Sequence, residues 1–162
     1  QIQLGRDNAN IDGGVFFRAA STLYGRLGVR ASLQAAFSTP ALLPEHTDKG
    51  FNVPAAPRSR KAKARRQGTL LKWKPGKGDR KNWPHYYAVY RFEGRKAGNS
   101  KNAGAIIHLT AFGEHKRRFK FTDTSAELGK TYTYILTGIN RTHREGEASK
   151  AVTVQFPAFS KP

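Results

Sequence analysis

The densest group of side chains that could take part in binding chemistry is a basic run at residues 58–66. Six of its nine residues are cationic, namely Arg58, Arg60, Lys61, Lys63, Arg65 and Arg66. Such a run could contact an anionic polymer, together with Lys72, Lys74, Lys77, Arg80 and Lys81. Its affinity would then fall steeply with salt because counterions are released. Few aromatic residues are interleaved with it, so it lacks the stacking platform that suits single-stranded nucleic acid. The alternative interpretation, a solvated basic linker, is the one we favour.

Net charge is concentrated in the same part of the chain. The formal charge of +18 divides into five basic and four acidic residues at 1–57 (+1) and 24 basic and seven acidic residues at 58–162 (+17). A cationic region of this kind favours anionic partners, which include nucleic acid, acidic polysaccharide and membrane surfaces. A second basic cluster, at 116–120, fits an edge strand blunted by charge.

Several kinds of site are excluded by the residue types present. The chain has no cysteine, which rules out disulfides, Cys-ligated zinc and a Cys nucleophile. Its five histidines lack metal-ligand spacing, and no Gly-x-Ser-x-Gly elbow is present, although a dispersed Ser/His/Asp triad stays open. We therefore expect no metal and no cofactor. No apolar run approaches the ~20 residues of a membrane span.

Period-2 alternation predicts that the chain is mainly β, with an antiparallel sandwich over about residues 67–160. Strands are expected at 69–74, 86–92, 104–111, 115–122, 131–139 and 150–156, with Gly-rich or polar turns between them. A Trp strand followed by two Tyr-rich strands is typical of a small sandwich. The expected core residues are Trp73, Tyr87, Val89, Tyr132, Tyr134 and Leu136, with Tyr132 bonded to nearby backbone as a tyrosine-corner residue.

The aromatic residues have a second interpretation as a platform for stacking sugar rings. We favour the core for Trp73 and Tyr132, because large aromatic residues in sandwich strands usually lie between the sheets. Trp83, His85 and Tyr86 lie in or beside a polar loop, so they are the better candidates for an exposed patch.

The N-terminal part has a different pattern, which indicates a piece of an α/β domain. A short strand at 1–5 and an apolar run at 15–17 precede Val29, Leu33, Ala36 and Phe37, whose spacing marks one face of an amphipathic helix. Pro40 ends that helix, and four prolines between residues 40 and 57 mark a boundary.

Together these motifs resemble a known family of bacterial proteins. Gly13-Gly14-Val15-Phe16-Phe17-Arg18 and Pro40-Ala41-Leu42-Leu43-Pro44 resemble the end of the barrel in glycoside hydrolase family 10-like lipoproteins. Leu71-x-Trp73, Tyr87-x-Val89-Tyr90-Arg91-Phe92 and Tyr132-x-Tyr134 resemble the fibronectin type III-like domain that follows that barrel.

This resemblance implies a division of the chain into three segments. Residues 1–44 would be the last strands and helix of an incomplete (β/α)8 TIM barrel, 45–67 a Pro-rich and basic linker, and 68–160 a fibronectin type III-like sandwich. A whole barrel takes roughly 250 residues, so its remainder is an expected partner, which another chain could supply. The family also implies a glycan substrate and export to the periplasm or anchoring at the outer membrane as a lipoprotein.

The barrel analogy also suggests residues that could touch the glycan. Residues just past a barrel strand line the active-site face, which would place Arg6, Asp7, Asn8 and Arg18 near sugar hydroxyls or a carboxylate. Their alternative is an Asx-turn and a surface ion pair. Glycoside hydrolysis usually needs two facing carboxylates, and no second strand here supplies a partner for Asp7 or Asp12. We expect that pair on earlier barrel strands, outside this chain.

The leading hypothesis is the C-terminal portion of an exported glycoside hydrolase-like protein, in which the sandwich is an accessory or positioning domain. Its alternative is a cationic binding module for an anionic polymer, either nucleic acid or acidic cell-wall polysaccharide. A purely structural subunit, with a stable protein partner, is the third possibility.

Overall fold

The computed structural model describes residues 7, 8, 10, 24, 28–46, 50, 52–77, 83–113 and 116–157. The chain divides into two compact units, Gln1–Thr39 and Pro40–Pro162. In the first unit the described element is the helix α3 (Val29–Ala36), whose half-buried residues Val29, Leu33 and Ala36 follow the predicted spacing. Phe37, the fourth residue predicted on that face, is the C-cap and is exposed. The expected barrel strands at 1–5 and 15–17, with Arg6 and Arg18, lie outside the described residues.

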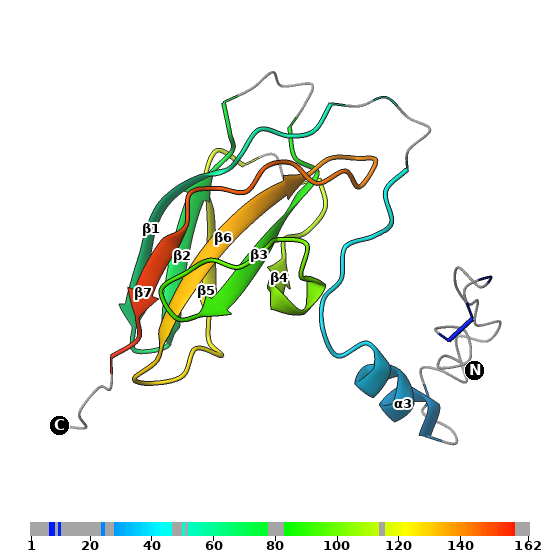
Figure 1. Cartoon of the computed structure of the whole chain (residues 1–162), viewed down its shortest axis with the longest axis horizontal. Coiled ribbons are helices and arrows are strands. Elements are labelled where there is room, and N and C mark those ends of the chain that lie inside the picture. Colours follow the sequence, from blue (N-terminus) through cyan, green and yellow to red (C-terminus); the bar gives the residue numbers. More distant parts are fainter. Residues whose placement is uncertain are drawn as a thin grey trace. The chain divides into compact units, whose positions relative to one another are not determined.

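The second unit is an antiparallel β-sandwich of two sheets (Figure 1). Three strands in the order β1-β2-β5 form one sheet: β1 (Arg58–Arg65), β2 (Gly68–Lys74) and β5 (Phe119–Asp123). Four strands in the order β4-β3-β6-β7 form the other: β4 (Ile106–Leu109), β3 (Tyr86–Glu93), β6 (Thr131–Ile139) and β7 (Val152–Gln155). All six strands expected from alternation are present, and the sandwich is confirmed as mainly antiparallel β.

The core lies between the sheets because alternate residues of each strand face inward. All six residues assigned to it from the sequence belong to one buried cluster. Trp73 on β2 stacks on Phe119 of β5 at 5.5 Å between ring centroids and meets Tyr87 of β3 edge-on at 5.8 Å. The hydroxyl of Tyr132 accepts a hydrogen bond from the backbone N–H of Glu127 at 3.3 Å, which ties the turn before β6 to the strand.

The basic run, predicted as part of a linker, forms strand β1 instead. Ala62 and Ala64 lie opposite Leu71 and Thr69 of β2 and pack against the core. Lys61, Lys63 and Arg65, which alternate with these alanines, are exposed. Small apolar residues that alternate with long charged residues make a strand with one half-buried face. The many charged residues led to the prediction of a linker because two alanines give little hydrophobic signal.

A second apolar cluster covers the outer face of the four-stranded sheet. Tyr86, Ala88 and Tyr90 alternate outward from β3 and pack with Ile106, Ile135 and Ile139. Tyr86 is only 2% exposed, so its assignment to an exposed patch was wrong: β3 already begins at this residue and buries its ring beneath Phe112, 4.7 Å away. Trp83 and His85 are half-buried.

Candidate functional site

The outer face of the three-stranded sheet gathers cations from all three strands. Strand register places Lys61 of β1 opposite Lys72 of β2, and Lys72 opposite Lys120 of β5. The three lysines therefore form a row across the sheet on the face opposite the buried Trp73. Like charges directly opposite one another on neighbouring strands destabilise a sheet, so this row suits an anionic ligand.

More cations flank this lysine row along the strands. The residues that alternate onto the same face are Arg58, Lys63 and Arg65 from β1 and Lys74 from β2, and of these only Lys74 is half-buried rather than exposed. No acidic residue occupies an outward position on the described strands of this sheet, since the one carboxylate of β5, Asp123, is buried inside. We call this surface the cationic face.

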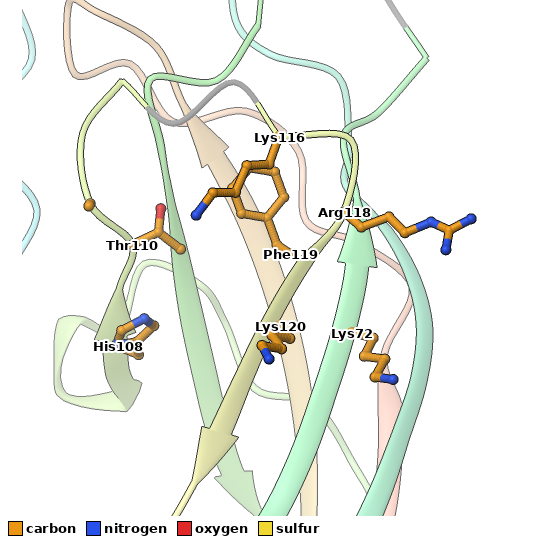
Figure 2. A pocket seen from close by; sticks show the side chains of 8 residues that line it. Lys72, His108, Thr110, Lys116, Arg118, Phe119 and Lys120 are labelled. Carbon is orange, nitrogen blue, oxygen red and sulfur yellow. The ribbon is translucent and has the colours of Figure 1, made fainter.

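At the β5 edge the cationic face opens into a groove with a volume of about 550 Å³ (Figure 2). The groove is lined by Lys72, His108, Thr110, Ala111, Lys116, Arg118, Phe119 and Lys120. Its walls come from both sheets: β4 and the residues after it supply His108 and Thr110, and β2 and β5 supply Lys72 and Lys120. Lys116 and Arg118 come from the segment just before β5. None of these described lining residues is acidic, so the groove is strongly electropositive.

Two side chains in the groove can serve neutral polar groups of a ligand. The ring of His108 stacks on Phe121, with 4.1 Å between centroids and 7° between planes. Burial lowers the pKa of His108, so at neutral pH its imidazole is uncharged and can both donate and accept a hydrogen bond. The hydroxyl oxygen of Thr110 accepts a hydrogen bond from the backbone N–H of Tyr87 at 2.9 Å, and its own hydrogen can be donated to a ligand.

The six basic residues predicted at 58–66 do not all lie on the cationic face. Arg58, Lys61, Lys63 and Arg65 lie on the cationic face, and Arg66 is exposed in the turn after β1. Arg60 lies at an irregularity in the β1–β2 register, and its side chain is outside the description. The alternation of alanine with lysine at 61–64 was the signal that could have revealed this strand.

Of the residues suggested by the barrel analogy, only two are described. Asp7 and Asn8 are exposed in the first unit, and Asn8 Oδ1 accepts a hydrogen bond from the backbone N–H of Asn10 at 3.0 Å. That geometry is the Asx-turn given as the alternative. Nothing in it tests whether these residues bind a sugar, which stays a prediction.

Sequence reasoning did not identify the groove as a site, although it included Lys72 among the basic residues that could contact an anionic polymer. Lys116, Arg118 and Lys120 were interpreted only as charges that blunt an edge strand, and β5 is indeed an edge of its sheet. Lys72, His108 and Thr110 come from strands far apart in sequence, so no local pattern indicates that they meet. Only the packing of one sheet on the other places them together.

Residues 42–46, which precede the first strand of the sandwich, contact the outer side of the four-stranded sheet and the loop after β6. Leu42 packs on the apolar cluster there. The carboxylate of Glu45 pairs with Arg144 Nε at 2.6 Å, and the backbone N–H of His46 donates to Thr142 O at 2.9 Å. We call residues 42–46 the strap.

The loop that receives the strap is itself internally bonded. Asn140 Oδ1 accepts hydrogen bonds at 2.9 Å from Thr142 N, Thr142 Oγ1 and Arg144 N. Glu145 accepts a hydrogen bond at 2.6 Å from the hydroxyl of the buried Tyr90. The loop at 140–145 is therefore ordered by its own hydrogen bonds and gives the strap defined partners.

Other kinds of site find no support in the described residues. No group of three His, Asp or Glu side chains among them could hold a metal ion. No helix in the described part of the chain is long and apolar enough to cross a membrane.

Comparison with known proteins gives one sequence relative and several structural neighbours. No protein-family model matches the chain. It is 31% identical over 155 residues to the glycosyl hydrolase YngK of Bacillus subtilis (strain 168), a match that covers 94% of this chain and 29% of that protein. The chain thus has a homologue named as a glycosyl hydrolase and spans less than a third of its length.

Two solved structures illustrate the structural neighbours. The third fibronectin III domain of the human KIAA0343 protein is 19% identical, with 74% of this chain and 94% of that chain covered and a TM-score of 0.46. A β-1,2-glucanase from Parabacteroides distasonis is 22% identical, with 75% of this chain and 14% of that chain covered and a TM-score of 0.44.

Proposed function

We propose that the chain is the C-terminal portion of an exported glycoside hydrolase-like protein and that its sandwich is an accessory domain that positions the enzyme on a glycan. The observation that carries this proposal is the sequence match to a protein named as a glycosyl hydrolase, which runs over 94% of this chain. The match therefore extends over both compact units rather than over a shared sandwich alone.

The accessory role is supported by what lines the groove. Glycoside hydrolysis usually uses two carboxylates that flank the scissile bond, and the described lining contains cations, His108 and Thr110 but no carboxylate. Such a lining suits binding better than bond cleavage. The catalytic pair would lie in the rest of a barrel, of which residues 1–44 would be the end and whose remainder would be the partner of this chain.

The strap supports a positioning role. A flexible linker without contacts would leave the rest of the enzyme free to move relative to the sandwich. Here Leu42, Glu45 and His46 each contact the sandwich. We include in the proposal the family 10-like barrel, the lipoprotein anchor and the export of the protein, which rest on the motifs described above.

An assay for sugar release and binding tests this proposal. The purified chain is incubated with a panel of cell-wall and storage polysaccharides, and reducing ends and co-sedimentation are both measured. We expect binding to at least one glycan without release of reducing ends. Robust release would contradict the accessory role, and a failure to bind any glycan would contradict the positioning role.

A second candidate function, a cationic module for an anionic polymer such as nucleic acid, is favoured by the cationic face. Binding to a single-stranded oligonucleotide, measured at ~50 mM and ~200 mM salt, tests it, because released counterions must weaken the complex. A steep loss of affinity with salt, together with no glycan binding, would favour this candidate. Affinity that is weak at both salt concentrations would remove it.

A further inference from the structure

We infer that the groove between β4 and β5 binds a negatively charged sugar unit of an acidic polysaccharide, and that the row Lys61, Lys72 and Lys120 guides the polymer across the sheet. The inference rests on the proposed glycan function and adds to it the chemical class of the ligand. It also assigns the groove as the part of the cationic face that recognises a particular group.

The cations that line the groove favour an anionic ligand. Lys72, Lys116, Arg118 and Lys120 line one volume of about 550 Å³ without an acidic residue among the described lining. Lys72 and Lys120 are directly opposite each other in the β2–β5 register. Their mutual repulsion is relieved when a carboxylate, sulfate or phosphate lies between them.

The nearest buried carboxylate cannot supply that counter-charge. Asp123 lies on β5 but faces the inside of the sandwich and is 2% exposed. Its oxygens are taken by Arg91 Nη1 at 3.0 Å, Tyr134 Oη at 2.9 Å and Ser125 Oγ at 2.7 Å. For Lys72 and Lys120, therefore, none of the described carboxylates lines the groove as a counter-charge, and an external anion can take that place.

The remaining groups of the groove suit a sugar ring. Neutral His108 and the Thr110 hydroxyl offer both donors and acceptors, which sugar hydroxyls need. The volume lies inside the range of about 300–1,000 Å³ typical of small-ligand sites. Sites for a charged sugar need this mixture of a few cations and uncharged hydrogen-bonding groups in one concavity.

The aromatic residues of the groove argue against nucleic acid as the ligand. Single-stranded nucleic acids gain affinity by stacking bases on exposed aromatic rings. Phe119 is the aromatic residue of the described lining apart from His108, and it is only 7% exposed. Its ring is engaged with Trp73 and, at 4.7 Å, with Tyr87. The outward positions on the described strands of the cationic face carry no aromatic side chain either.

The polymer has a path beyond the groove. Neighbouring strands lie about 4.8 Å apart, so Lys120, Lys72 and Lys61 present successive charges at that interval from the groove across the sheet. Lys63 and Arg65 lie farther along β1, away from the groove lining. They therefore offer a matched control of equal charge on the same face.

The test is calorimetric titration of the purified 162-residue chain with a defined oligouronate, such as oligogalacturonate. Its methyl ester supplies the same sugars without charge, a sulfated oligosaccharide supplies a different anion, and a single-stranded oligonucleotide supplies the charge without the sugar. Groove variant Lys72→Gln/Lys120→Gln is compared with control variant Lys63→Gln/Arg65→Gln, which loses the same net charge. Thermal melting checks that both variants are folded.

We expect the groove variant to bind the oligouronate about tenfold more weakly or worse, as loss of charge-assisted hydrogen bonds implies, and the control variant to lose less than about threefold. The Lys72→Arg variant keeps the charge and should keep most of the affinity. The methyl ester should not bind measurably. Tighter binding of the sulfated sugar would support the anionic-sugar site and identify sulfate as the preferred group.

Three results would overturn the inference. Equal losses in the groove and control variants would show diffuse attraction without a groove site. Equal binding of the methyl ester would show that charge is irrelevant, and tighter binding of the oligonucleotide would identify nucleic acid as the ligand. In the first two cases the chain still binds glycan and the proposed function stands, whereas no binding to any glycan, charged or neutral, contradicts the proposed function itself.

Discussion

Asp123, the last residue of β5, is a buried carboxylate with several hydrogen-bond partners. Arg91 pairs with it at 3.0 Å, and the hydroxyls of Tyr134 and Ser125 donate to it. The Arg91 guanidinium also lies 4.7 Å from the centroid of the Tyr132 ring. Asp123 thereby links β5 of one sheet to Arg91 on β3 and Tyr134 on β6 of the other sheet. A buried charge of this kind destabilises the fold when one of its partners is removed.

We predict that Asp123→Asn lowers the free energy of unfolding by about 3 kcal/mol, because it leaves the partly buried Arg91 without its counter-ion. Urea denaturation measures the change. The matched control is Glu93→Gln, which removes an exposed carboxylate 3.4 Å from Lys130 and should cost less than about 1 kcal/mol. Equal losses in the two variants would show that burial of the Asp123 pair is unimportant.

Acid should weaken the protein through the same residue. Burial opposes ionisation, but hydrogen bonds from Ser125 and Tyr134 and the charge of Arg91 outweigh it and hold the pKa of Asp123 below its ordinary value of 3.8. A carboxyl with a depressed folded-state pKa stabilises the fold fully above its unfolded pKa and loses that contribution as pH falls toward the folded one. Unfolding free energy should therefore drop below about pH 4 in the wild type, with a smaller drop in Asp123→Asn.

At the scale of elements, the β1–β2 hairpin brings the basic run onto the sheet, and Gly68 is the residue that permits it. Gly68 has a φ of +133°, and a Cβ at this position would lie 2.1 Å from the carbonyl oxygen of Asp123. We predict that Gly68→Ala costs about 2–4 kcal/mol, from backbone strain together with the clash. Thermal or urea unfolding measures it.

Gly94→Ala separates the strain from the clash. Gly94 also has a positive φ, +91°, but a Cβ there would meet nothing within 4 Å. This control should cost only about 1–2 kcal/mol from strain. If Gly68→Ala is no worse than Gly94→Ala, the close approach of β2 to the end of β5 does not constrain the hairpin.

The strap makes a prediction about local dynamics. Leu42 packs on the outer apolar cluster, and the amide of His46 is bonded to Thr142 O at 2.9 Å. We predict that Leu42→Ala accelerates hydrogen exchange at residues 42–46 while leaving the core strands protected, because local opening needs less free energy than global unfolding. The exposed Ala41→Gly is the control. Unchanged exchange in Leu42→Ala would mean that the strap is not held by this contact.

Much of this architecture could be predicted from sequence because the core residues are large and regularly spaced. Tyr87, Val89 and Tyr90 are aromatic or β-branched residues, and this composition predicts β3 without knowledge of its partners, although both faces of the strand are buried. β1 could not be recognised in the same way. Its inner face carries Ser59, Ala62 and Ala64, whose small side chains give a weak signal among lysines and arginines.

The candidate site was harder to predict from the sequence because it depends on the register of the strand pairs β1–β2 and β2–β5. That Lys61, Lys72 and Lys120 face one another follows from pairings between three strands, which a local pattern does not contain. The same holds for His108 and Thr110, which reach the groove from the opposite sheet. Basic residues were visible in the sequence, but their convergence on one concavity was not.

At the scale of the whole molecule, the net positive charge and the sequence match to a glycosyl hydrolase are both compatible with an acidic polysaccharide as ligand. The net charge of +18 would repel another cationic surface and attract an acidic polymer at long range, with a strength that salt reduces. A homologue named as a glycosyl hydrolase makes a polysaccharide the natural polymer to test first. A sandwich that binds an acidic glycan on one sheet and carries the strap on the other could hold an enzyme at its substrate.

The most direct measurement of this account follows bound chain and released reducing ends together, in one mixture of the purified chain with an acidic polysaccharide at ~50 mM and ~200 mM salt. We predict binding that weakens markedly at the higher salt and no release of reducing ends at either salt concentration. Release of reducing ends, or binding that is absent at both salt concentrations, would contradict it.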